Sequence, residues 1–245
     1  MRSFYLLALM CFSALTASLS VISCSSSVKN KLFSSDTKSY KSYRDAVKDL
    51  NFEAAHDTLS SYREDYLAEL SKDWLTYRDE RAAAQGKYYQ AFDEIYKAEI
   101  QYILSELRGD ECKDKILFLL EEIPVEGEKM PAGLCTDYVA HRGSLGNEGI
   151  PLDAYIIWTQ HYNRLCSNIL SLAINRKNQD LAKLIILQFV DNVEVTAGDI
   201  RADSGSIRVD GVIVDYHHGY IKYTSEDRNA AKEKYDEAVR SGAFQ

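Results

Sequence analysis

The residues best suited to acid–base or metal chemistry lie near the C-terminus, in the stretch VDYHHGYIKY. Asp215 here precedes His217 and His218. Alternation along a strand places Asp215 and His217 on one face and His218 on the other, so the two histidines cannot easily share a metal ion. Asp215 and His217 have the residue types of a general base and its orienting carboxylate. No nucleophile motif accompanies them, and the alternative interpretation is a polar turn with half-exposed imidazoles.

The remaining cysteines and histidines lack the spacing of metal ligands. His161 and Cys166 are five positions apart on a predicted helix, which separates them by roughly 140° around its axis. Cysteine pairs with zinc-site spacing and phosphate-binding glycine loops are absent from the sequence. We therefore expect no catalytic residue, no metal and no cofactor.

Tyrosine is the unusual component of the composition, with 17 Tyr against 8 Phe and 2 Trp. Tyrosine combines an apolar ring with a polar tip, which suits a groove that binds peptides or sugars. The residues that we expect to line such a groove are Tyr62, Tyr66, Tyr88 and Tyr89. The alternative is that the rings fill the edges between paired helices and keep their hydroxyls in water, and we favour it because composition alone discriminates poorly between interfaces and other surfaces.

The N-terminus reads MRSFYLLALMCFSALTASLSVISC, with a positive charge at Arg2 and an apolar run from Phe4 to Leu15. This run is shorter than the ~20 apolar residues that a membrane-spanning helix needs. Val21, Ile22, Ser23 and Cys24 then match, residue for residue, the site that lipoprotein signal peptidase cleaves. The segment resembles the lipobox of bacterial lipoproteins, although an ordinary secretory signal or a buried helix are the alternatives.

The lipobox resemblance covers only the first 24 residues. It implies that residues 1–23 are a signal peptide and that Cys24 becomes the lipid-modified first residue of the mature chain. Stable anchoring takes about two acyl chains, and the multiple chains of a lipoprotein meet this condition. Ser25 is compatible with outer-membrane sorting in well-studied Gram-negative lipoproteins. We therefore expect a lipid-anchored envelope protein, at the outer membrane and facing the periplasm or the cell surface.

The net charge argues against one class of partner. The chain has 29 Lys+Arg against 37 Asp+Glu, a formal charge of −8. An acidic chain binds polyanions poorly, so we expect no nucleic-acid partner. Of the cysteines after Cys24, Cys112 and Cys135 could form a disulfide that leaves Cys166 reduced, or all three could be buried thiols.

Composition divides the mature chain into three parts. Residues 24–37 are rich in serine and lysine and predict a flexible tether. Residues 38–190 predict a domain of helix pairs, interrupted at 124–151 by an irregular connection that holds all three prolines. Residues 191–245 predict a small β-meander and a terminal helix, packed on the helical domain because residues 205–245 alone hold too few apolar side chains to fold unaided.

The helical part contains an internal echo at an offset of 36 residues, which pairs Phe52 with Tyr88 and Ala55 with Ala91. The second copy, GKYYQAFDEIYKA, resembles the second half of a tetratricopeptide repeat. The resemblance implies an interhelical turn at Gly86, where the first copy has Leu50. The first helices of both copies lack the tryptophan, leucine and glycine pattern of that family.

Local patterns predict the remaining elements. Apolar residues at helical spacing predict helices over 152–173 and 179–190, with a tight turn between them. Asp210-Gly211 between two β-branched runs predicts a hairpin, and residues 220–223 predict a third strand. Ser225 or Thr224 is expected to cap a terminal helix that ends at Gly242. The predicted fold class is mainly α (α+β), with antiparallel helix pairs.

Three functions remain open from the sequence. The first is a non-catalytic helical module that binds a protein partner in the cell envelope. The second is a glycan- or small-ligand-binding lipoprotein of a nutrient-uptake system. The third is an envelope hydrolase that uses His217 with Asp215.

Overall fold

The structure is a computed structural model that describes residues 40–72, 76–127, 133–135, 150–197, 204–209, 212–217 and 219–245. The predicted signal peptide, Cys24 and the predicted tether lie outside the described residues. The chain divides into two compact units, the first ending at Thr58 and the second beginning at Leu59.

The first unit contains two helical segments joined by a tight turn at Leu50. Helix α3 (Tyr43–Lys48) begins where the hydroxyl of Ser42 accepts a hydrogen bond from the backbone N–H of Asp45. Leu50 connects α3 to helix α4 (Phe52–Leu70) with a φ of 56°. That left-handed conformation costs a leucine about 1–2 kcal/mol relative to a right-handed one. The turn expected at this position is therefore present without its glycine.

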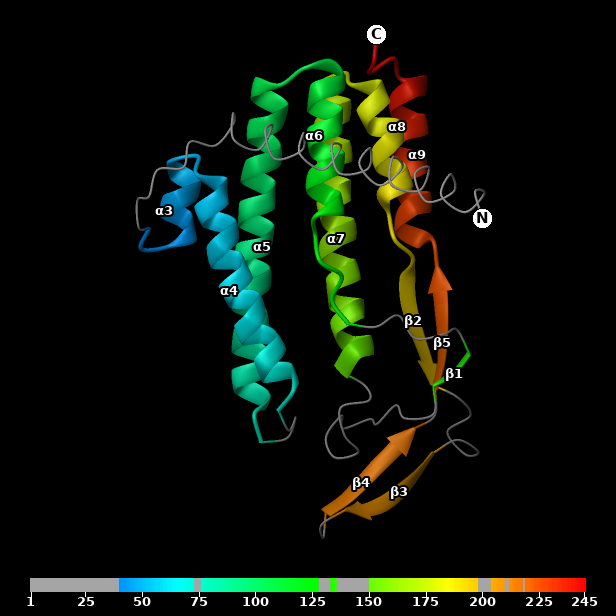
Figure 1. Ribbon diagram of the computed structural model, residues 1–245. Helices are drawn as coiled ribbons and strands as arrows, with labels where there is room; N and C mark the ends of the chain where they lie inside the picture. Colours follow the sequence, from blue (N-terminus) through cyan, green and yellow to red (C-terminus); the bar gives the residue numbers. More distant parts are fainter. Residues whose placement is uncertain are drawn as a thin grey trace, which may run out of the picture. The chain divides into compact units, whose positions relative to one another are not determined.

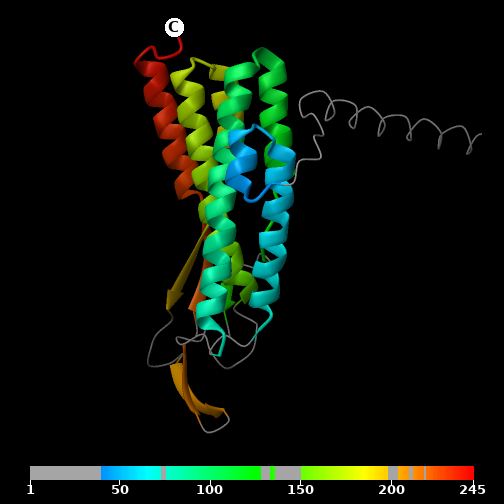
Figure 2. The same ribbon diagram turned by 90° about the vertical axis from the view of Figure 1, so that its left-hand side faces the viewer.

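The second unit contains the end of α4 and five further helices, which lie side by side and alternate in direction (Figures 1 and 2). They are α5 (Arg78–Glu106), α6 (Gly109–Glu121), α7 (Ile150–Asn175), α8 (Gln179–Gln188) and α9 (Glu226–Arg240). The predicted mainly α class is confirmed, as are the two helices over 152–173 and 179–190. Among the described residues, no helix is long and apolar enough to span a bilayer.

The predicted turn between two helices at Gly86 is wrong, because helix α5 continues through this position. Gly86, expected at an interhelical turn, lies inside this continuous helix of 29 residues. Glycine in a helix interior costs only about 1 kcal/mol, and the preceding run of alanines, Ala82 to Ala84, consists of the strongest helix formers. The buried rings of Tyr88, Tyr89 and Phe92 extend along the same helix. The glycine is therefore tolerated, and it does not end the helix.

A pair of glycine substitutions tests this continuity. A Cβ at Gly86 would meet no atom within 4 Å, whereas Gly109 has a φ of 58°. Gly86→Ala should therefore stabilise the protein by about 0.5–1 kcal/mol, and Gly109→Ala should destabilise it by about 1–2 kcal/mol. Thermal melting monitored by circular dichroism measures both changes. A lower melting temperature for Gly86→Ala would mean that Gly86 does occupy a turn.

The predicted single meander is wrong, because the C-terminal strands belong to two separate sheets. Strands β3 (Ser204–Val209) and β4 (Val212–His217) form the expected hairpin, with Val209 opposite Val212. Strand β5 (Gly219–Thr224) pairs with β2 (Asn192–Ala197) and with β1 (Gly133–Cys135), in the order β1-β5-β2. Among the described strands, β4 and β5 are thus neighbours in sequence but belong to different sheets. The connection 124–151 was expected to be irregular, but it contributes a strand to the C-terminal sheet.

Helix α9 packs on α7 and α8, and its N-terminus is capped from another element. Ser225 is the N-cap residue, but its hydroxyl donates to Asp191 at 3.1 Å and does not bond the helix. The side-chain oxygen of Asn192, in β2, accepts instead from the backbone N–H of Asp227 at 3.0 Å. Gly242 ends the helix with a φ of 74°, as expected.

Two apolar side chains near the C-terminus are exposed. Leu187 of α8, in the almost continuous apolar run from Leu184 to Leu187, is 71% exposed, and Val239 of α9 is 42% exposed. Small residues make the α9 contact instead, since Ala231 and Ala238 are buried and allow the helix to approach closely. Of the two alternatives for Cys112, a disulfide with Cys135 or a buried thiol, the structure has the buried reduced thiol.

Candidate functional site

The four tyrosines predicted to line a groove lie close together between α4 and α5. The Tyr66 and Tyr88 rings stack with centroids 5.6 Å apart, and Tyr89 lies 5.8 Å from Tyr66 and 4.7 Å from Tyr88. The groove itself needs correction, because no more than 3% of Tyr66, Tyr88 or Tyr89 is exposed. Packing of two antiparallel helices buries these rings in the core. Tyr62 is partly exposed, with the Lys87 ammonium 3.9 Å from its ring centroid.

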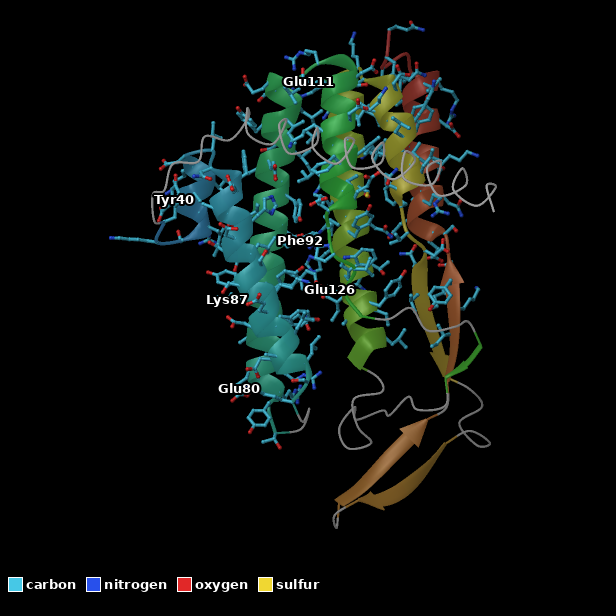
Figure 3. The ribbon with its side chains drawn as sticks, viewed as in Figure 1. Tyr40, Glu80, Lys87, Phe92, Glu111 and Glu126 are labelled. Carbon is cyan, nitrogen blue, oxygen red and sulfur yellow. The ribbon has the colours of Figure 1, made fainter. Side chains whose placement is uncertain are left out.

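A carboxylate from another part of the chain reaches this tyrosine cluster. Glu126 follows α6 in a non-helical segment, yet its side chain is 1% exposed. Its Oε1 accepts from Nε of Arg63 on α4 at 2.6 Å and from the Tyr88 hydroxyl on α5 at 3.0 Å. Figure 3 shows Glu126 beside α5, on the same side as Phe92. We call Arg63, Tyr66, Tyr88, Tyr89 and Glu126 the carboxylate clamp.

The charges of the clamp are complementary, but only one of the two carboxylate oxygens of Glu126 has a hydrogen-bond partner among the described residues. Burial lowers the pKa of Arg63, but the hydrogen bond and the negative charge of Glu126 outweigh this effect and leave the pKa raised. Burial, followed by the charge of Glu126, raises the pKa of Tyr88, so this hydroxyl stays protonated and donates. The second carboxylate oxygen, Oε2, is buried without a hydrogen-bond partner among the described residues. Such an unmet acceptor carries a cost of about 1–3 kcal/mol.

A second polar cluster joins α5 to α7 beside the clamp. Nδ1 of His161 lies 3.1 Å from Oδ1 of Asp93, and Arg164 forms an ion pair with the same carboxylate. The imidazole stacks on the Tyr89 ring, with centroids 4.1 Å apart and planes inclined by 19°. Helix packing therefore brings together an aspartate, a histidine and an arginine that are distant in sequence.

His161 can make only one of two hydrogen bonds through Nδ1. Arg164 Nη2 also lies 2.6 Å from this atom, but Nδ1 either donates to Asp93 or accepts from the guanidinium. When Nδ1 of the neutral imidazole donates to Asp93, Nε2 is left as a lone-pair acceptor, as in a histidine oriented for base or ligand chemistry. Apart from Asp93 and Arg164, the imidazole contacts the aromatic rings of Tyr89 and Phe92. Neither of these residues is a nucleophile of the serine or cysteine type. Among the described residues, no group of three or more His, Cys, Asp or Glu side chains could hold a metal ion.

The sequence-predicted polar cluster lies elsewhere. Asp215 and His217 belong to β4 and are paired opposite Ser206 and Ser204, respectively. His218 lies outside the described residues. The pairing of β4 fixes the backbone positions of Asp215 and His217, and the hydrolase that would use them remains the third of the untested hypotheses.

Burial suppresses the ionisation of the two described reduced cysteines, Cys112 and Cys166. Burial raises the pKa of the Cys166 thiol to about 12 and also raises the pKa of Cys112. A thiol that resists ionisation is a weak nucleophile. Both cysteines therefore contribute to packing, as one of the two predicted alternatives proposed.

Sequence reasoning missed Glu126, Asp93 and the role of His161. Glu126 meets Arg63 across 63 positions, and His161 meets Asp93 across 68. Nothing local distinguishes these residues from other charged residues, since their partners come from separate helices. The one signal that could have drawn attention to Glu126 is its place between Pro124 and Gly127, outside any helical pattern.

Comparison with protein-family models, curated proteins and solved structures finds no match to this chain.

Proposed function

We propose that this protein is a lipid-anchored protein of the bacterial cell envelope whose helical body binds a protein partner without catalysing a reaction. The observation that carries the proposal is the stretch from Val21 to Cys24, which resembles a lipobox. A cysteine directly after an apolar segment, with a small residue before it, is what lipidation requires. The lipid would hold the protein at the membrane, and residues 24–37 would tether it.

The form of the helical body supports an interaction role. Antiparallel helices packed side by side present long faces to solvent, and partners commonly bind on such faces or in the grooves between them. The polar residues that helix packing brings together, such as Glu126 and Arg63, contact one another across separate segments of the chain. Because these contacts already hold one segment of the chain against the helices, the helical body is suited to recognise or anchor a peptide segment.

Replacing the proposed lipidation site tests the anchor. Cys24→Ala should remove lipid incorporation and release the protein from membranes, or leave it unprocessed, because the lipid is the proposed attachment. Labelled palmitate followed by membrane fractionation measures both effects. Cys11→Ala, which changes the other cysteine of the N-terminal segment, is the matched control and should remain lipidated. Wild-type protein that incorporates no palmitate would contradict the proposal.

A further inference from the structure

The carboxylate clamp holds a short non-helical segment of the chain in the manner of a bound peptide. Helix α6 ends at Glu121, and residues 124–126 are neither helix nor strand. Glu126 reaches inward to Arg63 and Tyr88, whereas Val125 beside it is 57% exposed. The segment therefore inserts one acidic side chain between two helices and leaves its neighbour in solvent.

Glu126 makes fewer hydrogen bonds in the clamp than a fully paired buried carboxylate would make. Both hydrogen bonds to Glu126 go to Oε1, and Oε2 is buried without a partner among the described residues. The arginine contact uses Nε, whereas a carboxylate that is free to orient can bond a guanidinium through two parallel N–H groups. A different carboxylate could therefore satisfy the clamp better than Glu126 does.

The surroundings of Arg63 remain accessible from one side. The Arg63 side chain is 32% exposed, so an incoming group can reach it. Leu67 lies one helical turn further along α4, on the same face, and is 36% exposed. A cation and an apolar residue side by side on a helix match an extended segment with an acidic residue next to an apolar one.

We propose that the carboxylate clamp is the binding site for an acidic, extended peptide segment of the partner protein, and that Glu126 occupies it as an internal competitor. This inference rests on the proposed interaction function and names the chemistry of its partner. Tethering gives Glu126 an effective concentration in the millimolar range, so an external segment must bind better than Glu126 to displace it. Removal of the Glu126 carboxylate should open the site.

Titration of the full-length protein in detergent with a fluorescein-labelled peptide tests the proposal. The probe has the sequence of residues 121–127, EEIPVEG, and the control peptide has glutamine in place of its last glutamate. Fluorescence anisotropy should show that Glu126→Ala binds the probe at least tenfold more tightly than the wild type. The same variant should bind the control peptide at least fivefold more weakly than the probe. The double variant Arg63→Met/Glu126→Ala should lose this discrimination.

A folded Glu126→Ala protein that binds the probe no more tightly than the wild type would overturn the proposal and make the clamp purely structural. Equal binding of the two peptides would overturn it as well. If Glu126→Ala does not fold, the same titration of Glu126→Gln, which keeps the shape of the side chain, decides between these outcomes. Capture of a partner from cell envelopes is a separate measurement that tests the proposed function. If a partner is captured but the peptide titration shows no binding, only the proposal for this site is contradicted.

Discussion

Arg63→Met is expected to destabilise the protein by about 3 kcal/mol, because it leaves the buried carboxylate of Glu126 without its cation. The Glu126 side chain is 1% exposed, so water replaces the lost contact only in part. Breaking a buried ion pair from one side typically costs about 3–5 kcal/mol. The lower end applies here because Arg63 itself is 32% exposed and partly solvated. Urea denaturation followed by circular dichroism measures the change.

The matched control for Arg63→Met is Lys87→Met, on the adjacent helix. Lys87 contacts Asp65 at 3.8 Å and the Tyr62 ring, but the lysine side chain is 51% exposed and that of Asp65 is 63% exposed. An exposed pair of this kind contributes at most about 1 kcal/mol. The Arg63→Met/Glu126→Ala double variant should recover much of the loss, since it removes both charges. Equal effects of Arg63→Met and Lys87→Met would mean that the clamp contributes little to the fold.

Asn163→Ala is expected to cost about 3 kcal/mol, because Asn163 joins α7 to the start of the C-terminal sheet and to α9. The side chain of this asparagine, which is 1% exposed overall, exchanges two hydrogen bonds of 3.1 Å with the backbone of Val190. It also donates to Asp227 at 2.9 Å. Alanine would leave the backbone N–H and C=O of Val190 without these partners, at about 1–3 kcal/mol each, whereas Asp227 would keep its hydrogen bond from Asn192.

The control for Asn163→Ala is Asn168→Ala, on an exposed position of the same helix. This change should shift stability by less than about 0.5 kcal/mol, since exposed substitutions rarely do more. Chemical denaturation of both variants makes the comparison. If Asn163→Ala unfolds at the same urea concentration as the wild type, α9 and β2 do not depend on α7 for their stability.

The parts of the fold that sequence predicted are those specified by local patterns. The helix over 152–173 has apolar residues at helical spacing, and the hairpin has Asp-Gly between β-branched runs, so each depends on neighbours within a few positions. The tight turn at residues 176–178 is likewise local, with Lys177 at a φ of 58° and Asn178 capping α8. These elements form where the patterns place them.

The parts that sequence could not predict depend on distant partners. Asn192 caps α9 across 35 positions, which no pattern near Ser225 indicates. Strand β1 joins β5 across the whole of α7 and α8, and three residues are too few to give a strand pattern. At Gly86 the local glycine signal was misleading, because the helix formers around it and the packing of α5 outweigh its cost.

The candidate site also combines features that local sequence predicts with features that depend on distant partners. The tyrosines stood out by number, and their proximity in the structure follows from two helices that pack side by side. Their burial depends on what covers them, and the covering carboxylate of Glu126 comes from a segment that composition marked only as irregular. The His161–Asp93 contact is similar, since each residue alone resembles an ordinary polar residue on a helix.

Affinity isolation from detergent-solubilised envelopes tests most directly whether this protein binds a partner there. Tagged full-length protein and a tagged control that ends at residue 39, with the same signal and tether region, are purified in parallel and compared by quantitative mass spectrometry. The proposed function predicts at least one envelope protein that is reproducibly enriched with the full-length chain, and that is lost when the tagged protein is Cys24→Ala. Repeated isolation of the full-length chain with no protein enriched over the control would contradict it.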